Sequence, residues 1–253
     1  MKVFFKRFSN IIYPVIGLLT VLALWAILAS IVGVDLIIPS IKDTFSSLGI
    51  LLSNSTFYLA VLNTLWRTLL TFAIALICGV LFAIMGAVLP IFAKIFTPIM
   101  RFLRAVPTIS VILLIIVWLD PVWAPILVTL LIVFPICYSN MYDVIVGINK
   151  DYLTLCKTYQ ISKGDAVKSL YIPYVLPTFF DTARATISLT IKVVISAEVM
   201  AQTKGSMGIM MQIAKASLET ADLLAWTICA IVLSYFLEFV VALIKKSVVR
   251  WEK

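Results

Sequence analysis

Four polar residues recur at every fourth position within one apolar stretch of the chain: Arg184, Ser188, Lys192 and Ser196. On a helix of about 3.6 residues per turn this spacing drifts by about 40° per step, so the four side chains form one slowly winding stripe. An ionised lysine that faces lipid near the middle of a bilayer costs about 2.5–3.5 kcal/mol. Lys192 is therefore expected to face a cavity or a polar partner rather than lipid.

Two acidic residues lie in similarly apolar surroundings. Glu198 follows Lys192 by six residues and so lies about 120° away round the helix, which predicts no direct pair between them. Glu238 follows Asp222 by 16 residues, about 24 Å along the next apolar stretch, and this depth matches that of Arg184. The sequence therefore predicts a structural ion pair between Arg184 and Glu238.

The residue types needed for enzyme chemistry are scarce. The chain has no histidine and only 12 acidic residues. Its apolar stretches hold neither paired carboxylates at helix spacing nor a nucleophile beside a base. The sequence contains no GxxxxGK[ST] phosphate-binding loop. We therefore expect no catalytic residue, no metal site and no cofactor in this chain, and any ATP and Mg²⁺ would be bound by a partner subunit.

The composition is that of a membrane protein. Apolar residues make up 63% of the chain and charged residues 13%, against about 45–50% and 25% in soluble domains. The net charge of +8 is concentrated between the apolar runs rather than along one face, which is typical of membrane topology and not of a nucleic-acid-binding surface. The predicted fold class is an all-α membrane protein in contact with the lipid bilayer.

The apolar stretches predict about six transmembrane helices in a single domain over residues 1–253. The first is charge-free from Phe8 to Val34, which exceeds the about 7–15 residues of a signal-peptide core and reaches the roughly 20 that cross a bilayer. The fifth is the least apolar, because it carries four charged residues. The predicted spans are residues 11–33, 60–89, 98–119, 122–143, 177–200 and 222–244.

The distribution of basic residues predicts the orientation. Of the 20 Lys and Arg residues, 2 fall within the fifth span and 4 on the outer side (Lys42, Arg67, Lys204 and Lys215), which leaves 14 on the inner side. This excess follows the positive-inside rule when both termini are cytoplasmic. Omitting the fifth span would place the basic C-terminal tail outside, so six spans fit the charges better.

The longest inner loop, residues 150–173, predicts two short helices. Asp151 is a plausible N-cap of the first, and the stretch Ser162–Asp165 has the form of a capping box for the second. A break is expected at Gln160-Ile161, and Pro173 is expected to stop the second helix because proline lacks an amide donor. Either a docking surface or a merely solvated loop would have this pattern.

Several motifs in this order along the chain resemble a known family. The stretch Leu153–Pro177, closed by Ile172-Pro173 and Leu176-Pro177, resembles the EAA loop of ABC importer permeases. Other motifs are similar to the nitrate/sulfonate/taurine permease group of that family. These are Ile38-Pro39-Ser40, Asn63–Arg67, Pro98–Pro107, Ala197-Glu198, Gly205–Gly208 and the terminal Arg250-Trp251.

The resemblance implies an importer permease of a bacterial inner membrane. Its expected partners are a cytoplasmic ABC ATPase dimer, a second permease copy or a related chain, and an extracytoplasmic substrate-binding protein. The cargo is expected to be a small polar or anionic solute or a vitamin precursor. The residues expected to couple to the ATPase are Asp151, Thr154, Leu155, Lys157, Thr158, Gln160, Ser162, Gly164 and Asp165.

The loop departs from the family pattern at two places. The family's Glu-Ala-Ala positions are occupied by Thr154, Leu155 and Cys156, and its usual glycine by Gln160. A left-handed backbone at Gln160 would cost about 1–2 kcal/mol relative to glycine. These departures bear on the strength of docking rather than on the architecture.

The polar stripe gives a tentative translocation pathway. We expect Ser188, Lys192, Ser196 and Glu198 to line it, although a structural contact between helices is an equally open interpretation of Lys192. The alternative class is an ion-gradient-driven transporter or channel. Such proteins commonly show internal repeats with interrupted helices in both halves, and no convincing repeat is present here.

Overall fold

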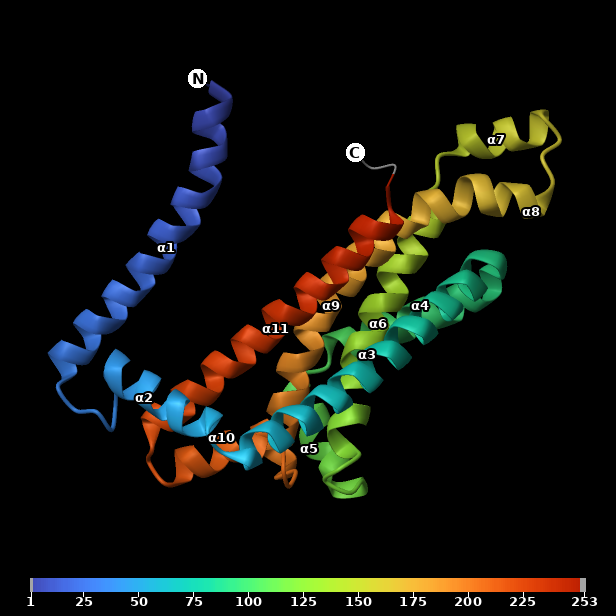
Figure 1. Ribbon diagram of the computed structural model, residues 1–253. Helices are drawn as coiled ribbons and strands as arrows, with labels where there is room; N and C mark the ends of the chain where they lie inside the picture. Colours follow the sequence, from blue (N-terminus) through green and yellow to red (C-terminus); the bar gives the residue numbers. More distant parts are fainter. Residues whose placement is uncertain (1, 251–253) are drawn as a thin grey trace. The chain divides into compact units, whose positions relative to one another are not determined.

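The computed structural model describes residues 2–250, with side chains from Ile12 onward. The described chain is a series of helices that divides into two compact units, one built from residues up to Tyr58 with Met210–Ile228, and the other from Leu59–Ile209 with the remainder. Figure 1 labels the helices: α1 (Lys2–Val32), α2 (Ile41–Leu52), α3 (Ser55–Val88), α4 (Pro90–Ala105), α5 (Thr108–Trp118), α6 (Ala124–Val146), α7 (Lys150–Thr158), α8 (Lys163–Ala166), α9 (Ile172–Ala201), α10 (Met207–Ala216) and α11 (Thr220–Val248).

The first unit joins α1 and α2 to the connection between α10 and α11. Ser40 caps α2, where its hydroxyl oxygen accepts a hydrogen bond from the amide of Asp43 at 3.1 Å. The indole Nε1 of Trp25 donates to the carbonyl of Pro39 at 3.1 Å, and the hydroxyl of Thr220 donates to the carbonyl of Asp35 at 2.8 Å. These bonds hold the turn after α1 to its neighbours within the unit.

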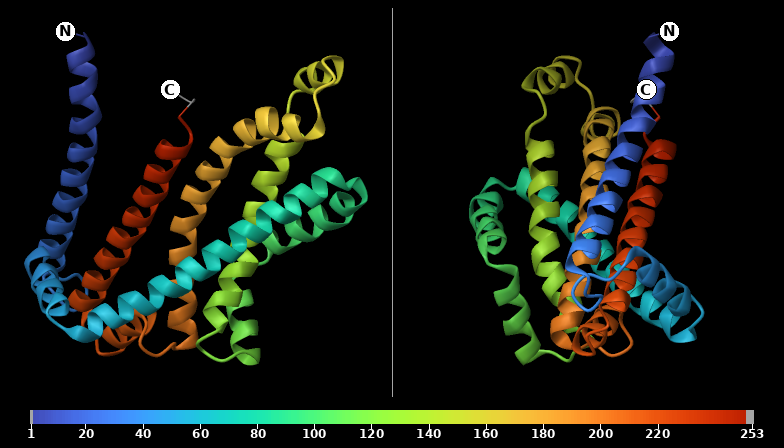
Figure 2. Two further views of the ribbon diagram at one scale, coloured as in Figure 1. Left: turned by 45° about the vertical axis from the view of Figure 1, so that its right-hand side comes forward. Right: turned by 90° about the vertical axis from the view of Figure 1, so that its left-hand side faces the viewer.

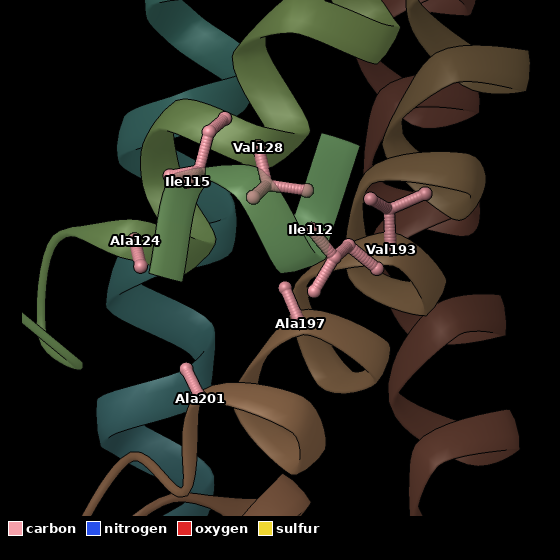
Figure 3. Packing of buried hydrophobic residues seen from close by; sticks show 7 residues of the cluster. All are labelled: Ile112, Ile115, Ala124, Val128, Val193, Ala197 and Ala201. Atoms are coloured by element: carbon pink, nitrogen blue, oxygen red, sulfur yellow. The ribbon is translucent and has the colours of Figure 1, made fainter. Parts of the chain in front are cut away.

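The second unit is built around the contact between α6 and α9. Figures 1 and 2 show these two helices side by side, with α11 along the other side of α9. At one end of the contact, α5 contributes Ile112 and Ile115, which cluster with residues of α6 and α9, and Figure 3 shows their packing. The buried members of the cluster are Ile112, Ile115, Ala124, Val128, Val193, Ala197 and Ala201.

Small residues bring α3 against α6. A methyl group built on Gly79 would lie 2.5 Å from the Cβ of Cys137 and 3.1 Å from that residue's carbonyl carbon. Small residues allow this kind of backbone approach, which dispersion and close packing then stabilise between membrane helices. Ala75 and Val133 are fully buried in the same contact.

The predicted span at residues 98–119 is not one helix. The chain bends by 96° between α4 and α5. Val106 is extended (φ −69°, ψ 130°) because the residue before a proline is sterically pushed out of the helical region, and Pro107 then opens α5 without needing an amide partner. Figures 1 and 2 show α4 returning alongside α3.

The expected stop at Pro173 is also absent. The chain passes from α8 through a π-helical turn, Val167–Tyr171, directly into α9. The amide of Ile172 donates to the carbonyl of Val167, a pattern with one more residue than an α-helical turn. This wider turn lets Pro173 lie in a continuing helix, because the hydrogen-bond register of the carbonyls before it has shifted by one residue.

Within the part of the chain that the structure describes, four helices have the length and hydropathy of a membrane span: residues 12–32 of α1, and α3, α6 and α11. The bent pair of α4 and α5 adds a fifth if it crosses as one broken span. Helix α9 has 30 residues, about 45 Å, and is long enough to cross, but it carries the charges noted above. The count of six spans therefore stays a prediction.

A single methyl group tests the α3–α6 contact. Gly79→Ala is expected to destabilise the protein by about 1–3 kcal/mol, because the added Cβ overlaps Cys137 and the helices must separate. The matched control is Gly49→Ala in α2, where a Cβ meets nothing within 4 Å. There alanine is expected to stabilise the helix by about 0.5–1 kcal/mol. Thermal unfolding of the purified variants is expected to show a lower melting temperature for Gly79→Ala and a higher one for Gly49→Ala. Equal shifts would contradict the close packing of α3 against α6.

Candidate functional site

Glu198, expected along the pathway with Lys192, instead lies in a fully buried polar network. Its side chain has 0% exposure, and Oε1 accepts a hydrogen bond from Nη1 of Arg67 at 3.0 Å. Oε2 accepts from the hydroxyl of Thr64 at 2.8 Å and from the amide of Gly208 at 3.2 Å. Within the single chain, this carboxylate joins α3 to the first turn of α10 and does not line an open surface.

The first turn of α10 is shaped around this carboxylate. The amide of Met207 donates to the Thr64 hydroxyl at 3.0 Å, so two of the unpaired amides at this helix start are satisfied by the network. A Cβ on Gly208 would lie 2.5 Å from the Cβ of Glu198 and 2.8 Å from the carbonyl of Ile195. Glycine at position 208 is therefore required for the amide to reach the carboxylate.

Arg67, which the sequence analysis placed on the outer side of the membrane, is buried inside the protein. Arg67 is 4% exposed, and Nη1 also donates to the carbonyl of Asn63 at 3.3 Å, one turn earlier in α3. The spacing Asn63–Thr64–Arg67 on one helix face was visible in the sequence. Its partner Glu198 lies 131 residues away, so the sequence offered no local signal for the pair.

The remaining members of the polar stripe separate into two groups. Lys192 and Ser196 are exposed on α9, and the hydroxyl of Ser196 donates to the Lys192 carbonyl at 2.9 Å. Among the described residues, Lys192 makes no ion pair. Ser188 is buried, with its hydroxyl 3.0 Å from that of Ser234 on α11. Apart from Arg184, which is exposed beside Glu238, the open part of the stripe in one chain is the Lys192–Ser196 turn.

Two ion pairs connect α9 to α11 near the other end of α9. Arg184 Nε lies 3.8 Å from Glu238 Oε2, so the structure brings together the two residues that we predicted as a pair. Lys245 Nζ donates to Asp181 Oδ1 at 2.8 Å, a contact that the sequence analysis did not identify. The side chains of Arg184 and Asp181 are 58% and 62% exposed, so these bonds are weakened by solvent.

The loop after α6 forms two capped helices. The N-cap of α7 is Asn149 rather than Asp151, and its side-chain oxygen accepts from the Asp151 amide at 2.9 Å. Ser162 caps α8, where Oγ accepts from the Asp165 amide at 3.2 Å and donates to the Asp165 carboxylate at 2.6 Å. The loop residues expected to couple are all exposed: Asp151, Thr154, Leu155, Lys157, Thr158, Gln160, Ser162, Gly164 and Asp165.

Gln160 takes the left-handed conformation between these helices, with φ of +50°. The amide of Ile161 donates to the Cys156 carbonyl at 2.9 Å, and that of Gln160 to the Lys157 carbonyl at 3.1 Å. This pair of bonds is the Schellman arrangement at a helix C-terminus. The turn that glycine commonly builds is thus built by glutamine, at a conformational cost of about 1–2 kcal/mol.

One face of α7 carries an exposed apolar stripe, of which the sequence analysis named Leu155 alone. Tyr152, Leu155 and Tyr159 are 49%, 51% and 75% exposed. Their spacing of three and four residues places them in one stripe. Thr154 and Lys157 lie on the opposite, polar face of the same helix. The amphipathic spacing was present in the sequence and is the signal that would have found this stripe.

Comparison with known proteins decides the family. Residues 75–250 match the family described as "Binding-protein-dependent transport system inner membrane component". The chain belongs to this family. The match begins within α3 and continues through α11, so it includes the loop of residues 150–173, all of α9 and Glu198 of the buried network. It leaves α1, α2 and Arg67 outside the matched residues.

Individual relatives of this permease cover about three quarters of the chain. It is 23% identical over 188 residues to the formylaminopyrimidine transport permease protein ThiX of Halalkalibacterium halodurans, covering 74% of each chain. It is 27% identical over 217 residues to the bicarbonate transport system permease protein CmpB of Synechocystis sp., covering 77% of this chain and 73% of that one.

A solved structure shares the fold of this permease. A chain of the inward-facing MetNI methionine ABC transporter aligns with a TM-score of 0.59 and 14% identity, and the alignment covers 77% of this chain and 98% of that one. The all-α membrane fold and the membership in the ABC importer permeases therefore agree with the expectation from the sequence.

The buried network predicts a large effect of breaking one partner. Arg67→Met is expected to destabilise the permease by about 3–5 kcal/mol, because it leaves the Glu198 charge buried and uncompensated. The double variant with Glu198→Met removes both charges and is expected to recover a large part of that loss.

The control is Arg184→Met, at the exposed Arg184–Glu238 pair, where a change of about 0–1 kcal/mol is expected. The free energy of unfolding of the purified variants, followed by tryptophan fluorescence, measures all three. Equal destabilisation by Arg67→Met and Arg184→Met would show that the buried pair has no special role.

Proposed function

We propose that this permease forms the translocation pathway of an ATP-driven importer in a bacterial inner membrane and transmits the ATPase motion through residues 150–173. The family match is the observation that carries the proposal. ATP and Mg²⁺ are bound and hydrolysed on a separate cytoplasmic ATPase dimer, since this chain has no phosphate-binding loop. A second permease copy or a related chain completes the pathway, and an extracytoplasmic binding protein delivers the cargo.

The contact with the ATPase is made by the apolar stripe of α7. Tyr152, Leu155 and Tyr159 present about two turns of exposed apolar surface on a short helix. A short amphipathic helix of this kind docks into an apolar groove through residues at positions i, i+3 and i+7. The polar residues predicted for coupling, among them Thr154 and Lys157, then lie around the rim of the contact.

The orientation follows from the charges. With both termini cytoplasmic, the loop that contains α7 and α8 lies on the ATP-bearing side, where the inner segments hold 14 of the 20 basic residues. The first turn of α10, tied to Glu198, then lies on the outer side. The binding protein would approach this side of the permease.

The cargo is a small polar or anionic solute or a vitamin precursor. The two relatives are named as transporters of formylaminopyrimidine and bicarbonate, which are both small and polar. The exposed Lys192 and Ser196 of α9 supply a cation and a hydroxyl to the pathway. Selection of one cargo within this class is left to the binding protein.

Substitutions on opposite faces of α7 test its contact with the ATPase subunit. Leu155→Asp is expected to reduce co-purification of the ATPase subunit with the tagged permease at least about tenfold, because an unpaired carboxylate would enter an apolar groove. Lys150→Asp places the same side chain on the opposite face of the same helix, outside the residues expected to couple. This control is expected to retain the ATPase within about twofold.

The amount of permease in the membrane fraction shows whether both variants fold. Full ATPase retention by Leu155→Asp, at normal permease levels, would remove α7 from the contact. A permease that purifies without any nucleotide-hydrolysing subunit in its unmodified form would overturn the importer assignment.

Lys192 is tested by transport rather than by assembly. Lys192→Ala and Lys192→Met are expected to lower uptake of the solute that the binding protein delivers, while the ATPase still co-purifies. Both variants lose the charge, and methionine keeps most of the side-chain length. The matched control is Lys215→Met, a cation on the outer helix α10. Normal uptake by both Lys192 variants would place Lys192 outside the pathway.

A further inference from the structure

Helix α4 has three faces at about 100° per residue: a packed face about 120° wide, an open apolar face about 80° wide, and a basic face about 80° wide that overlaps the packed one at Arg104. The first face packs against the rest of the second unit. Ala93 and Met100 are buried on it, Phe96 and Leu103 are partly buried, and Thr97 forms a 3.0 Å hydroxyl contact with Tyr138 of α6. This face fixes the position of α4 on the helix bundle.

The second face of α4 is apolar and open. Its four side chains recur at three- and four-residue spacing and are between 46% and 75% exposed: Ile91, Ile95, Ile99 and Phe102. A row of this size on a membrane protein faces acyl chains, because lipid is as apolar as the side chains themselves.

The third face of α4 is basic. Lys94, Arg101 and Arg104 are all exposed on it, and α4 contains no acidic residue. Among the described residues none of the three forms an ion pair. A helix with one apolar and one Lys/Arg-rich face is the pattern of an interfacial helix, which lies in the boundary between headgroups and acyl chains.

The contacts of α4 place it near one membrane surface. Ile112 and Ile115 of α5 pack beside Ala124 at the start of α6. Met100 of α4 packs instead beside Met141 of α6, which is 17 residues and about 26 Å from Ala124. Because α6 is about 35 Å long, α4 crosses it close to the end opposite α5.

The 96° bend places α4 and α5 at different parts of α6. Helix α5 runs beside the first turns of α6, and α4 leaves it at nearly a right angle. Figure 2 shows the bend, with α5 leading down from the end of α4. The basic face is thus within reach of the headgroups on the side where the loop with α7 and α8 begins.

We propose that Lys94, Arg101 and Arg104 form a binding site for anionic phospholipid headgroups, with the neighbouring Ile91–Phe102 stripe on the acyl chains of the same leaflet. In the orientation proposed above this is the cytoplasmic leaflet, whose anionic lipids attract clustered basic residues. The lipid occupant follows from the apolar stripe, since a soluble anion would meet the three cations but would leave that stripe in water.

Retention of lipid by the full-length permease tests the site. The protein is reconstituted in nanodiscs of phosphatidylcholine mixed with phosphatidylglycerol, and the lipids it keeps are measured by native mass spectrometry. The triple variant Lys94→Gln, Arg101→Gln, Arg104→Gln is expected to lower the preference for phosphatidylglycerol by roughly tenfold or more. The control Lys204→Gln, Lys215→Gln removes two cations elsewhere and is expected to keep the preference.

Depth gives a second readout that needs no transport. A bimane label on Ile95→Cys or Phe102→Cys, with the four native cysteines replaced, is expected to be quenched by acyl-brominated phosphatidylcholine. A label on Met100→Cys, on the packed face, is expected to be quenched at least about twofold less, because its burial keeps bromine away.

Three results would overturn the proposal. The first is unchanged phosphatidylglycerol retention by the triple variant. The second is displacement of the retained lipid by inorganic phosphate, which would make the basic face a soluble-anion site. The third is loss of the ATPase subunit from the triple variant with lipid retention intact, which would make this face a protein contact. Lipid retention is measured without cargo or ATP, so failure here leaves the importer function untouched.

Discussion

The carboxylate of Glu198 is the group on which the junction of α3, α9 and α10 depends. A charge with no exposure to solvent persists only when every strong acceptor site is satisfied. Here Arg67 supplies the opposite charge, while Thr64 and the amide of Gly208 supply the remaining bonds. Displacing any of these elements would leave a buried polar group unpaired, so α3, α9 and the start of α10 hold one relative position.

Close packing fixes the apolar contacts between helices, as hydrogen bonding fixes the groups around Glu198. Gly79 brings α3 against Cys137 of α6, and the cluster around Val128 joins α5, α6 and α9 (Figure 3). Together they give the second unit a fixed frame. The faces that this frame leaves open in one chain are chemically different: a cation and a hydroxyl on α9, an apolar stripe on α7, and a basic face on α4. Each kind of surface suits a different neighbour, as proposed above for the translocation pathway, the ATPase and the lipid.

The two proline sites illustrate how context decides the effect of a residue. Pro107 separates two helices by 96°, whereas Pro173 lies in a helix that continues. The difference is the π-helical turn at Val167–Tyr171, which shifts the hydrogen bonds before Pro173 reaches them. The sequence analysis treated Pro173 as a stop, and that expectation was wrong.

Composition and local spacing alone determined the membrane class, the all-helical fold and the two short helices of the loop, because these depend on residue type and near neighbours. The family was indicated by the resemblance of several motifs along the chain. The equal depth of Arg184 and Glu238 along their helices could also be predicted, since the rise per residue is constant along a helix. The tertiary structure alone decided that Glu198 is buried with Arg67, that Ser188 is covered while Lys192 stays open, and that α4 turns away from α5. Contacts over 131 residues and the exposure of a helix face depend on which helices become neighbours, and no local pattern in the chain encodes that choice.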